Sequence, residues 1–295
     1  MPLVATLVSH PAARALSPAL ARSAASAGGA SGIVWLAEGL ACDLALPQGG
    51  HAEAAERAIR AALAGAPVDV AVQEAERRRK RLLVADMDST IIDQECIDEL
   101  AAEVGLKDRV GEITERAMRG EIGFEPALRE RVALLKGLEA SVIERVLARR
   151  ITVKPGTRGL VATMRAFGAR TALVSGGFES FTKPIAALVG FDEHQANRLL
   201  IEDSRLTGRV AEPILGRAAK AEALRRLSSS LGITPADAIA VGDGANDLDM
   251  LHAAGTGVAF HAKPAVAAAA KLRIEHADLT ALLFLQGYRE SEFVR

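Results

Sequence analysis

The sequence predicts an α/β protein: a Rossmann-like parallel sheet with a helical cap inserted after its first strand, preceded by a small α+β module. Three observations carry this prediction. From residue 153 onward, short apolar runs alternate with helical segments, which is typical of a parallel sheet wrapped by helices. Residues 94–152 are rich in Glu, Arg, Leu and Ala and have helical periodicity. Residues 1–76 follow the order βαββαβ, which is the ferredoxin-like arrangement.

The composition argues against several classes of protein. The 295 residues are enough for two domains with a small insertion. The 36 basic and 37 acidic residues are nearly balanced and aromatic residues are scarce, so we expect no nucleic-acid partner. No apolar stretch approaches the roughly 20 residues needed to cross a membrane. The two cysteines, Cys42 and Cys96, support neither a disulfide framework nor a zinc cluster, so we expect a cytoplasmic location.

The amino-terminal module is predicted from short apolar runs between turn residues. Its expected strands cover residues 3–8, 33–37, 41–46 and 68–72, and its expected helices cover residues 11–25 and 51–63. The first 37 residues lack Asp and Glu, as transit peptides do, but the strand at residues 3–8 and the few arginines argue against a targeting segment. The module contains no catalytic constellation, so we expect a regulatory or dimerisation role, with any homodimer forming through it.

A run of five basic residues, 77–81, follows this module. Such a run is usually solvated, and we expect a linker rather than a polyanion site. The core is then expected over residues 82–93 and 153–295, and the cap over residues 94–152. Glycines divide the cap into several helices: Gly105, Gly111, Gly120, Gly123 and Gly137.

The core elements follow from the same alternation of apolar runs and helical segments. The strands are expected at residues 82–85, 170–175, 238–241, 257–260 and 273–275, with a hairpin at residues 195–208. The helices are expected at residues 157–167, 178–189, 217–231 and 248–254.

The first core strand ends in two aspartates. Residues 82–85 are an apolar run typical of a buried parallel strand, and Asp86 and Asp88 follow at i, i+2. Alternate strand residues share a side, so both carboxylates can face the crevice where open α/β sheets bind ligands. Two carboxylates repel each other unless a cation lies between them, and hard oxygen ligands favour Mg²⁺. The alternative is a solvated acidic turn.

Two later strands also end in polar residues. The second ends in Ser175-Gly176-Gly177, and the third in a glycine-rich turn that contains Asp243, Asn246 and Asp247. Lys220 lies on the helix between them. Phosphoryl transfer needs this mixture: a carboxylate nucleophile, a second carboxylate for proton transfer, a cation, and donors for the phosphate oxygens. Each signal has an ordinary structural explanation when taken singly: a turn, a surface lysine or a helix cap.

The motifs together resemble the haloacid dehalogenase superfamily of phosphatases. They are Asp86-Met-Asp88-Ser-Thr90, Ser175-Gly-Gly, Lys220 and Gly242-Asp243-Gly-Ala-Asn246-Asp247, in register over residues 82–285. The resemblance implies that Asp86 is the nucleophile and Asp88 the acid/base.

The resemblance also implies a ligand set. Mg²⁺ would be held by Asp86, by the backbone carbonyl of Asp88 and by Asp243, with Asp247 supporting it through water. The phosphate would be held by Ser175, Gly176 and Lys220, with Asn246 near it and the substrate. Some members of the superfamily carry an ACT-like regulatory module before the core, and the βαββαβ order of residues 1–76 is compatible with one.

Two cap segments, residues 95–99 and 124–132, resemble the caps of those superfamily members that hydrolyse O-phosphoserine. By this likeness Glu95 would receive the substrate ammonium and Arg131 its carboxylate, with Met118 and Phe124 closing the apolar side. An arginine fork suits a planar carboxylate. The alternative is that Glu95 and Arg131 are ordinary surface charges. The implied reaction is Mg²⁺-dependent hydrolysis of phosphoserine through an aspartyl phosphate, in serine biosynthesis.

Two other functions fit the same motifs. One keeps the chemistry but changes the substrate to another small phosphomonoester, or the phosphoryl acceptor from water to a hydroxyl compound such as homoserine. The other is a non-enzymatic phospho-acceptor, because signalling receiver domains also collect acids, a hydroxyl and a lysine at strand ends. The second carboxylate, Asp88, and the predicted cap favour an enzyme over a receiver.

Overall fold

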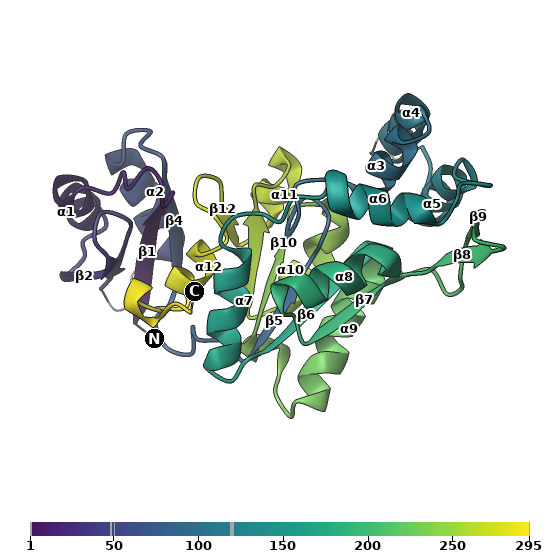
Figure 1. The fold of residues 1–295 in the computed structure, drawn as a ribbon. Helices are drawn as coiled ribbons and strands as arrows, with labels where there is room; N and C mark the ends of the chain where they lie inside the picture. The colour runs from purple at the N-terminus through teal and green to yellow at the C-terminus, as the bar shows by residue number, and fades with distance from the viewer. Residues whose placement is uncertain (1, 48, 50, 119–120, 295) are drawn as a thin grey trace.

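A six-stranded parallel sheet forms the centre of the protein (Figure 1). The computed structural model describes residues 2–47, 49, 51–118 and 121–294, with the backbone alone at residue 118. The strand order is β12-β11-β10-β5-β6-β7, and every neighbouring pair is parallel. The strands are β5 (Leu82–Ala85), β6 (Arg170–Phe178), β7 (Glu193–Asn197), β10 (Ala238–Gly242), β11 (Thr256–Phe260) and β12 (Leu272–Ile274). This confirms the predicted α/β class with its parallel sheet.

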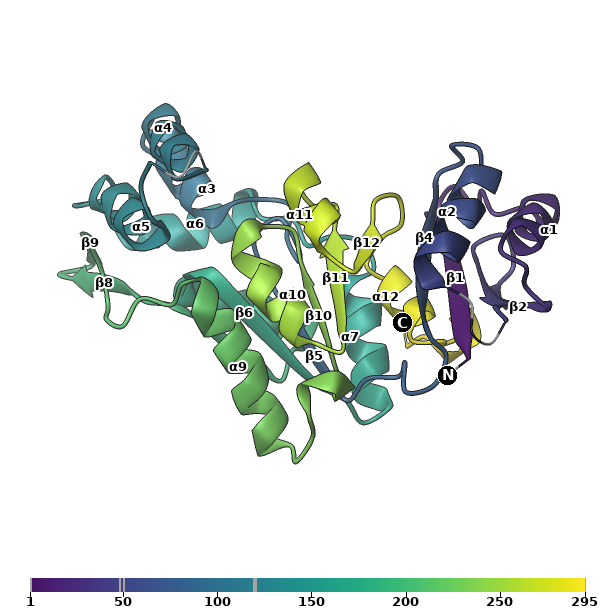
Figure 2. The ribbon, with the colours of Figure 1, turned by 180° about the vertical axis from the view of Figure 1, so that it is seen from behind.

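Helices cover both faces of the sheet. Figure 1 shows α7 (Thr157–Ala166) and α8 (Glu179–Val189) in front of it, and Figure 2 shows α9 (Arg217–Ser230) and α10 (Leu248–Ala253) on the opposite face. Alternate residues of β5 divide between the two layers, because Leu83 packs with α7 and α8 while Leu82 packs with α9 and α10. A strand covered on both faces is apolar throughout, which explains the unbroken run of β5.

The cap is a helical insertion between β5 and α7. It consists of α3 (Cys96–Ala102), α4 (Lys107–Met118), α5 (Phe124–Ala133) and α6 (Ser141–Arg149). A hairpin of β8 (Leu199–Glu202) and β9 (Arg205–Val210) extends from the core and joins the cap, where Gly137 N donates to Leu206 O at 2.8 Å. Figure 1 shows the hairpin beside α5. The cap therefore rests on a second arm of the core as well as on its two connections to the sheet.

Several element predictions were wrong in detail. The first helix, α1 (Pro18–Ala27), begins seven residues later than expected, because Ser17 caps it by accepting from Leu20 N and Pro18 fits its first position. The expected hairpin at residues 195–208 contained the end of β7, which instead joins the parallel sheet. Gly111 lies inside α4, where it breaks nothing, and Gly120 lies outside the described residues.

The C-terminal region holds two short helices that were not predicted. They are α11 (Pro264–Ala269) and α12 (Ala281–Leu285), and both are too short to show helical periodicity. No helix among the described residues combines the length and the apolar character needed to span a membrane.

The amino-terminal module has the predicted βαββαβ order. Its antiparallel sheet runs β2-β3-β1-β4, with β1 (Leu3–Ser9), β2 (Gly32–Ala37), β3 (Ala41–Ala45) and β4 (Val68–Glu74), and α2 is Ala52–Ala62. One face of this sheet packs on α1 and α2 around residues such as Leu7 and Ile59. The other face, including Val8 and Ala71, joins the apolar cluster of the core. Both faces are therefore buried, one of them against the core.

Polar contacts tie this module to the core. Asp69 of β4 is 2% exposed and accepts hydrogen bonds from the backbone N–H groups of Glu275 (2.7 Å) and Ala277 (2.8 Å), just after β12. Gln73 of the same strand donates to Leu285 O at 2.6 Å. These backbone groups of the core would lose their partners without β4, so the two parts are fitted to each other.

The basic run is only partly solvated, contrary to the expectation of a simple linker. Arg77 and Arg81 are exposed, but Arg78 pairs with buried Asp43 at 2.6 Å. Arg79 lies over the ring of Tyr288, 4.1 Å from its centroid, and pairs with Glu292. Arginine is suited to such stacked and paired positions, so this run fastens the module to the C-terminal segment.

We predict that Asp69→Ala lowers the free energy of unfolding by about 2–4 kcal/mol, because buried N–H groups then lose a charged acceptor. Denaturant unfolding measures this. Glu74→Ala, at an exposed carboxylate of the same strand, is the matched control and should change it by less than about 0.5 kcal/mol. Equal, small effects of both substitutions would contradict the role of Asp69 in holding the module to the core.

Candidate active site

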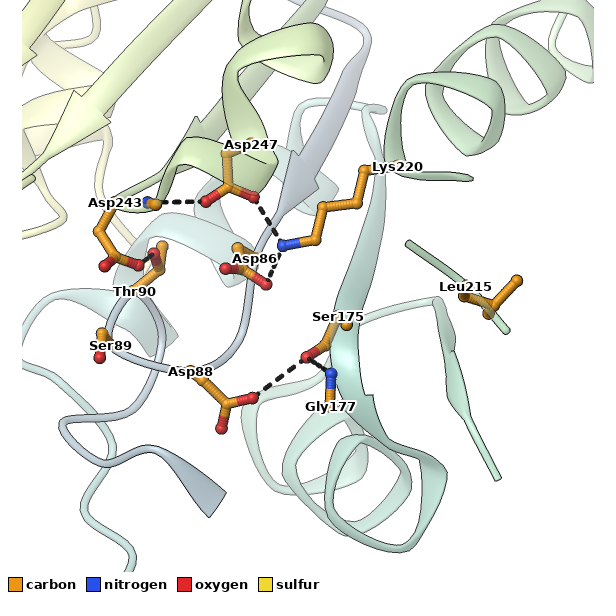
Figure 3. Close-up of polar contacts among 12 residues, drawn as sticks. Asp86, Asp88, Ser89, Thr90, Ser175, Gly177, Leu215, Lys220, Asp243 and Asp247 are labelled. Atoms are coloured by element: carbon orange, nitrogen blue, oxygen red, sulfur yellow. Dashed lines mark hydrogen bonds and ion pairs between the residues drawn. The ribbon is translucent and has the colours of Figure 1, made fainter. Parts of the chain in front are cut away.

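A buried lysine lies between two carboxylates at the carboxyl ends of the central strands (Figure 3). Lys220 of α9 is 2% exposed, and its Nζ lies 2.6 Å from Asp86 Oδ1 and 2.6 Å from Asp247 Oδ1. Asp86 directly follows β5, and Asp247 belongs to the turn after β10. Burial alone would lower the pKa of Lys220, but the charges of Asp247 and Asp86 outweigh it and raise this pKa. Lys220 therefore stays protonated.

A third carboxylate, Asp243, completes an acidic cluster. Carboxylate oxygens of Asp86, Asp243 and Asp247 lie within 4.8 Å of one another. Asp243 accepts from Thr90 Oγ1 at 2.9 Å, and both side chains are buried. Burial, with the charge of Asp247, raises the pKa of Asp243 to about 6. Burial and Asp247 also raise the pKa of Asp86, against the opposing effect of Lys220.

Asp88 lies apart from this cluster and is held by different partners. Its Oδ1 accepts from the backbone N–H of Cys96 at 3.0 Å, and its Oδ2 accepts from Ser175 Oγ at 3.3 Å. Ser175 Oγ in turn accepts from Gly177 N at 2.8 Å. A methyl group on Gly177 would stand 2.6 Å from Asp88 Oδ2, so any larger residue would displace the Asp88 carboxylate. Burial raises the pKa of Asp88, while hydrogen bonds from Cys96 oppose the rise.

Glu95 and Arg131 bring opposite charges from the cap toward Asp88. Glu95 accepts from Ser89 Oγ at 2.8 Å. Although the residue is partly exposed, the surrounding protein desolvates its carboxylate, and this with the charge of Asp88 raises the pKa of Glu95 to about 7. Burial lowers the pKa of Arg131, and the charges of Asp98, Glu95 and Asp88 oppose this. Within the described residues, no carboxylate lies within ion-pair distance of Arg131.

The remaining predicted residues take different places. Phe124, at the start of α5, lies against Gly176 of the core. Asn246 is partly buried and its side-chain oxygen lies against Gly244. The side chain of Met118 lies outside the described residues. The structure thus brings Asp86, Asp88, Ser175, Lys220, Asp243 and Asp247 together, and their individual roles stay predictions.

Sequence reasoning missed two contributors. Cys96 supplies the backbone N–H that holds Asp88, and no sequence signal marks a backbone donor. Asn197, 2% exposed at the end of β7, hydrogen-bonds the backbone of Gly176. The predicted hairpin over residues 195–208 includes Asn197, so the sequence does not mark it as the end of a parallel strand beside the serine loop.

The donor set fits a hard divalent cation. Three carboxylates face a single ammonium in a buried space, which leaves excess negative charge, and carboxylate oxygens are the ligands that Mg²⁺ prefers. Burial, and after it the charge of Asp247, raises the pKa of both Asp86 and Asp243. The other grouping of metal-ligand side chains, around Asp69, does not fit a cation, because Asp69 already accepts from three backbone N–H groups.

Comparison with known proteins identifies the family. The model of the haloacid dehalogenase-like hydrolases matches residues 83–252, from β5 to α10. The chain belongs to the haloacid dehalogenase-like hydrolase family. This membership confirms the family resemblance of the sequence motifs, and it favours an enzyme over a non-enzymatic phospho-acceptor.

Individual members of this hydrolase family are similar over most of the chain. A phosphoserine phosphatase from Streptomyces coelicolor is 46% identical over 235 residues, which are 80% of this chain but only 57% of that protein. A HAD family hydrolase from Salmonella enterica serovar Typhi has a TM-score of 0.86 at 29% identity, covering 96% of this chain and 98% of its own. A probable phosphoserine phosphatase from Vibrio cholerae has a TM-score of 0.78 at 30% identity, covering 99% and 88%.

The acidic cluster predicts a pH-dependent stability of the metal-free protein. The folded state keeps the proton of Asp243 up to about pH 6, whereas the unfolded chain releases it near 3.8, so the share of stability from Asp243 falls as pH rises between these values. We therefore compare the Tm of the wild type with the Tm of the Asp243→Asn variant, both in EDTA. The wild-type value minus the variant value should become smaller as the pH rises from 3.8 to about 6.

Differential scanning calorimetry measures this difference. Asp249→Asn is the matched control. Asp249 is exposed and hydrogen bonds from Arg217 lower its pKa, so the contribution of Asp249 to stability cannot fall as the pH rises. A difference between wild type and Asp243→Asn that rises with pH would contradict the raised pKa of Asp243.

Proposed function

We propose that this protein is a Mg²⁺-dependent phosphatase that hydrolyses O-phosphoserine to serine and phosphate in serine biosynthesis. The observation that carries the proposal is the pair Glu95 and Arg131. Among the residues that the structure describes, Arg131 has no carboxylate partner, and both side chains lie close enough to Asp88 for its charge to affect their pKa. The 46% identity to a phosphoserine phosphatase supports the same substrate. The two cysteines are buried free thiols, which supports a reducing cytoplasm as the setting.

Asp86 is the nucleophile in this proposal. A carboxylate oxygen of Asp86 forms a bond to phosphorus while the bond from phosphorus to the serine oxygen breaks, giving an aspartyl phosphate. Lys220, 2.6 Å away, stabilises the ionised form of Asp86 and later the negative oxygens of the phosphoryl group. A bound Mg²⁺, held by Asp86, Asp243, the backbone carbonyl of Asp88 and Asp247 through water, would supply the charge that lets carboxylate and phosphate approach.

Asp88 is the general acid of the first step and the general base of the second. It does not contact Lys220, and its raised pKa suits a group that is protonated before it gives its proton to the departing serine oxygen. In the second step Asp88 takes a proton from water, whose oxygen bonds to phosphorus as the bond to Asp86 breaks. Each proton is thus returned, and Asp86 and Asp88 end as they began.

The proposed site binds the substrate both at its phosphate and at its amino-acid end. Ser175 Oγ, the backbone N–H of Gly176 and Lys220 bind the phosphate. Glu95 receives the ammonium, and Arg131 offers two parallel donors to the carboxylate. Phosphate release from phosphoserine, beside sugar, nucleotide and aryl phosphates, with Mg²⁺ and with EDTA, tests the proposal. Turnover of phosphoserine no faster than of generic phosphates would overturn the substrate assignment.

We expect Asp86→Asn to lower turnover of phosphoserine at least about 10³-fold, because an amide cannot form the acyl phosphate. The fold should survive, since the substitution removes one negative charge from an acidic cluster. Asp93→Asn, at an exposed aspartate paired with Lys154, is the control and should keep full turnover. A phosphate-release assay beside a thermal melt measures both. Near-normal turnover by Asp86→Asn would eliminate Asp86 as the nucleophile.

We expect Arg131→Ala to raise KM for phosphoserine about 10²-fold, the effect of losing charge-assisted hydrogen bonds, and to leave KM for p-nitrophenyl phosphate nearly unchanged. Arg129→Ala is the matched control, because Arg129 lies on the same helix, is exposed and pairs with Glu125. Steady-state kinetics on both substrates give the comparison. An equal rise in KM for the two substrates would mean that Arg131 does not bind the carboxylate of phosphoserine.

A further inference from the structure

A buried amide links the phosphate loop to the segment that precedes α9. Asn197 Nδ2 donates to Gly176 O at 2.8 Å and to Leu215 O at 3.1 Å, and Leu215 N donates to Asn197 Oδ1 at 2.7 Å. Asn197 is 2% exposed. Figure 3 shows Leu215 on the segment beside the loop that carries Ser175 and Gly177. Three hydrogen bonds from one side chain thus fix two backbone segments that are far apart in sequence.

The first of these segments is the proposed phosphate loop. The carbonyl of Gly176 and the N–H of Gly177 belong to one peptide group. Asn197 holds its carbonyl, and Ser175 Oγ accepts from its N–H at 2.8 Å. The same hydroxyl donates to Asp88 at 3.3 Å. Since a peptide group is planar, holding both ends fixes its orientation and with it the loop.

The second segment and the loop form a slot for a cap residue. A methyl group on Gly176 would stand 3.2 Å from Phe124 Cζ, and one on Gly216 would stand 3.3 Å from Phe124 Cδ1. The ring of Phe124 therefore lies against two glycine backbones, and a larger residue at either position would require the ring to shift. Asn197 hydrogen-bonds Gly176, which forms one wall of the slot, and Leu215, which precedes Gly216 in the other wall. The amide of Asn197 therefore sets the distance between the two walls.

We propose that Asn197 is a positioning residue that fixes the phosphate loop and sets the width of the slot in which Phe124 seats the cap. This rests on the proposed function, since it assigns the loop to phosphate binding. Without the amide, the Gly176–Gly177 peptide can turn and the slot can widen, which loosens both the loop and the first turn of α5.

The test compares Asn197→Ala with Gln195→Ala. Gln195 is also an amide on β7, but its side chain accepts a hydrogen bond from exposed Arg226 instead of bonding Gly176 or Leu215. Titration calorimetry with inorganic phosphate, below the Tm of every variant, should show a Kd raised about tenfold in Asn197→Ala, as for one lost net hydrogen bond. KM should rise alike for phosphoserine and p-nitrophenyl phosphate. Gln195→Ala should match the wild type throughout.

Hydrogen exchange of the peptide covering residues 123–130 gives a readout that does not depend on activity. Asn197→Ala should speed its exchange, and Gln195→Ala should not. If the wild type failed to turn over phosphoserine, the proposed function would fall while this readout still decided the role of Asn197. Wild-type phosphate affinity together with wild-type exchange in Asn197→Ala would overturn the proposal.

A second variant covers the case in which Asn197→Ala does not fold. Gly216→Ala adds a methyl group against the ring of Phe124 and leaves the amide of Asn197 intact. It should also speed exchange over residues 123–130, because the added methyl group makes the ring shift within the slot. Unchanged exchange in Gly216→Ala would show that the slot does not seat the cap, and would overturn that part of the proposal by itself.

Discussion

The buried contact of Lys220 with Asp86 and Asp247 is the constraint on which the site depends. Charged groups without water are costly unless they are paired, and here one ammonium faces three carboxylates. The fold must therefore bring the ends of β5 and β10 and the first turns of α9 to one point, and hold them there. The parallel sheet does this, because the carboxyl ends of its strands meet along one edge. The remaining negative charge is what makes the site receptive to a divalent cation.

The cap and the amino-terminal module surround this site in different ways. The cap meets the core through the ring of Phe124 against Gly176, through backbone hydrogen bonds to the β8–β9 hairpin such as Gly137 N to Leu206 O, and through apolar side chains of α3 and α6 that belong to the buried cluster of the core. The module meets it through a buried sheet face, through Asp69, and through the paired and stacked arginines 78 and 79. Both parts are therefore joined to the core by buried apolar surface, and the module adds the charged and stacked contacts of Asp69, Arg78 and Arg79.

Most of the fold was predictable because periodicity and strand-end motifs are local in sequence. The apolar run before Asp86 and the turn from Asp243 to Asp247 marked their strands and the site without any structure. Prediction failed where long-range contacts decide: β7 was assigned to a hairpin because its place at the sheet edge depends on β6. The basic run was taken for a solvated linker because Asp43 and Tyr288 are distant in sequence. The hydrogen bonds of the Cys96 backbone N–H and of the Asn197 amide likewise depend on the tertiary structure, so the local sequence does not reveal them.

The central claim is that the acidic cluster is completed by a cation, and Mg²⁺ binding to the chelator-treated protein tests it most directly. Titration calorimetry in buffers of different ionisation enthalpy should show one saturable site. Protons should be released on binding near pH 6, where Asp243 is partly protonated in the metal-free protein. Binding should be lost in Asp243→Asn. Absence of saturable binding, or binding that Asp243→Asn leaves unchanged, would contradict this account of the site.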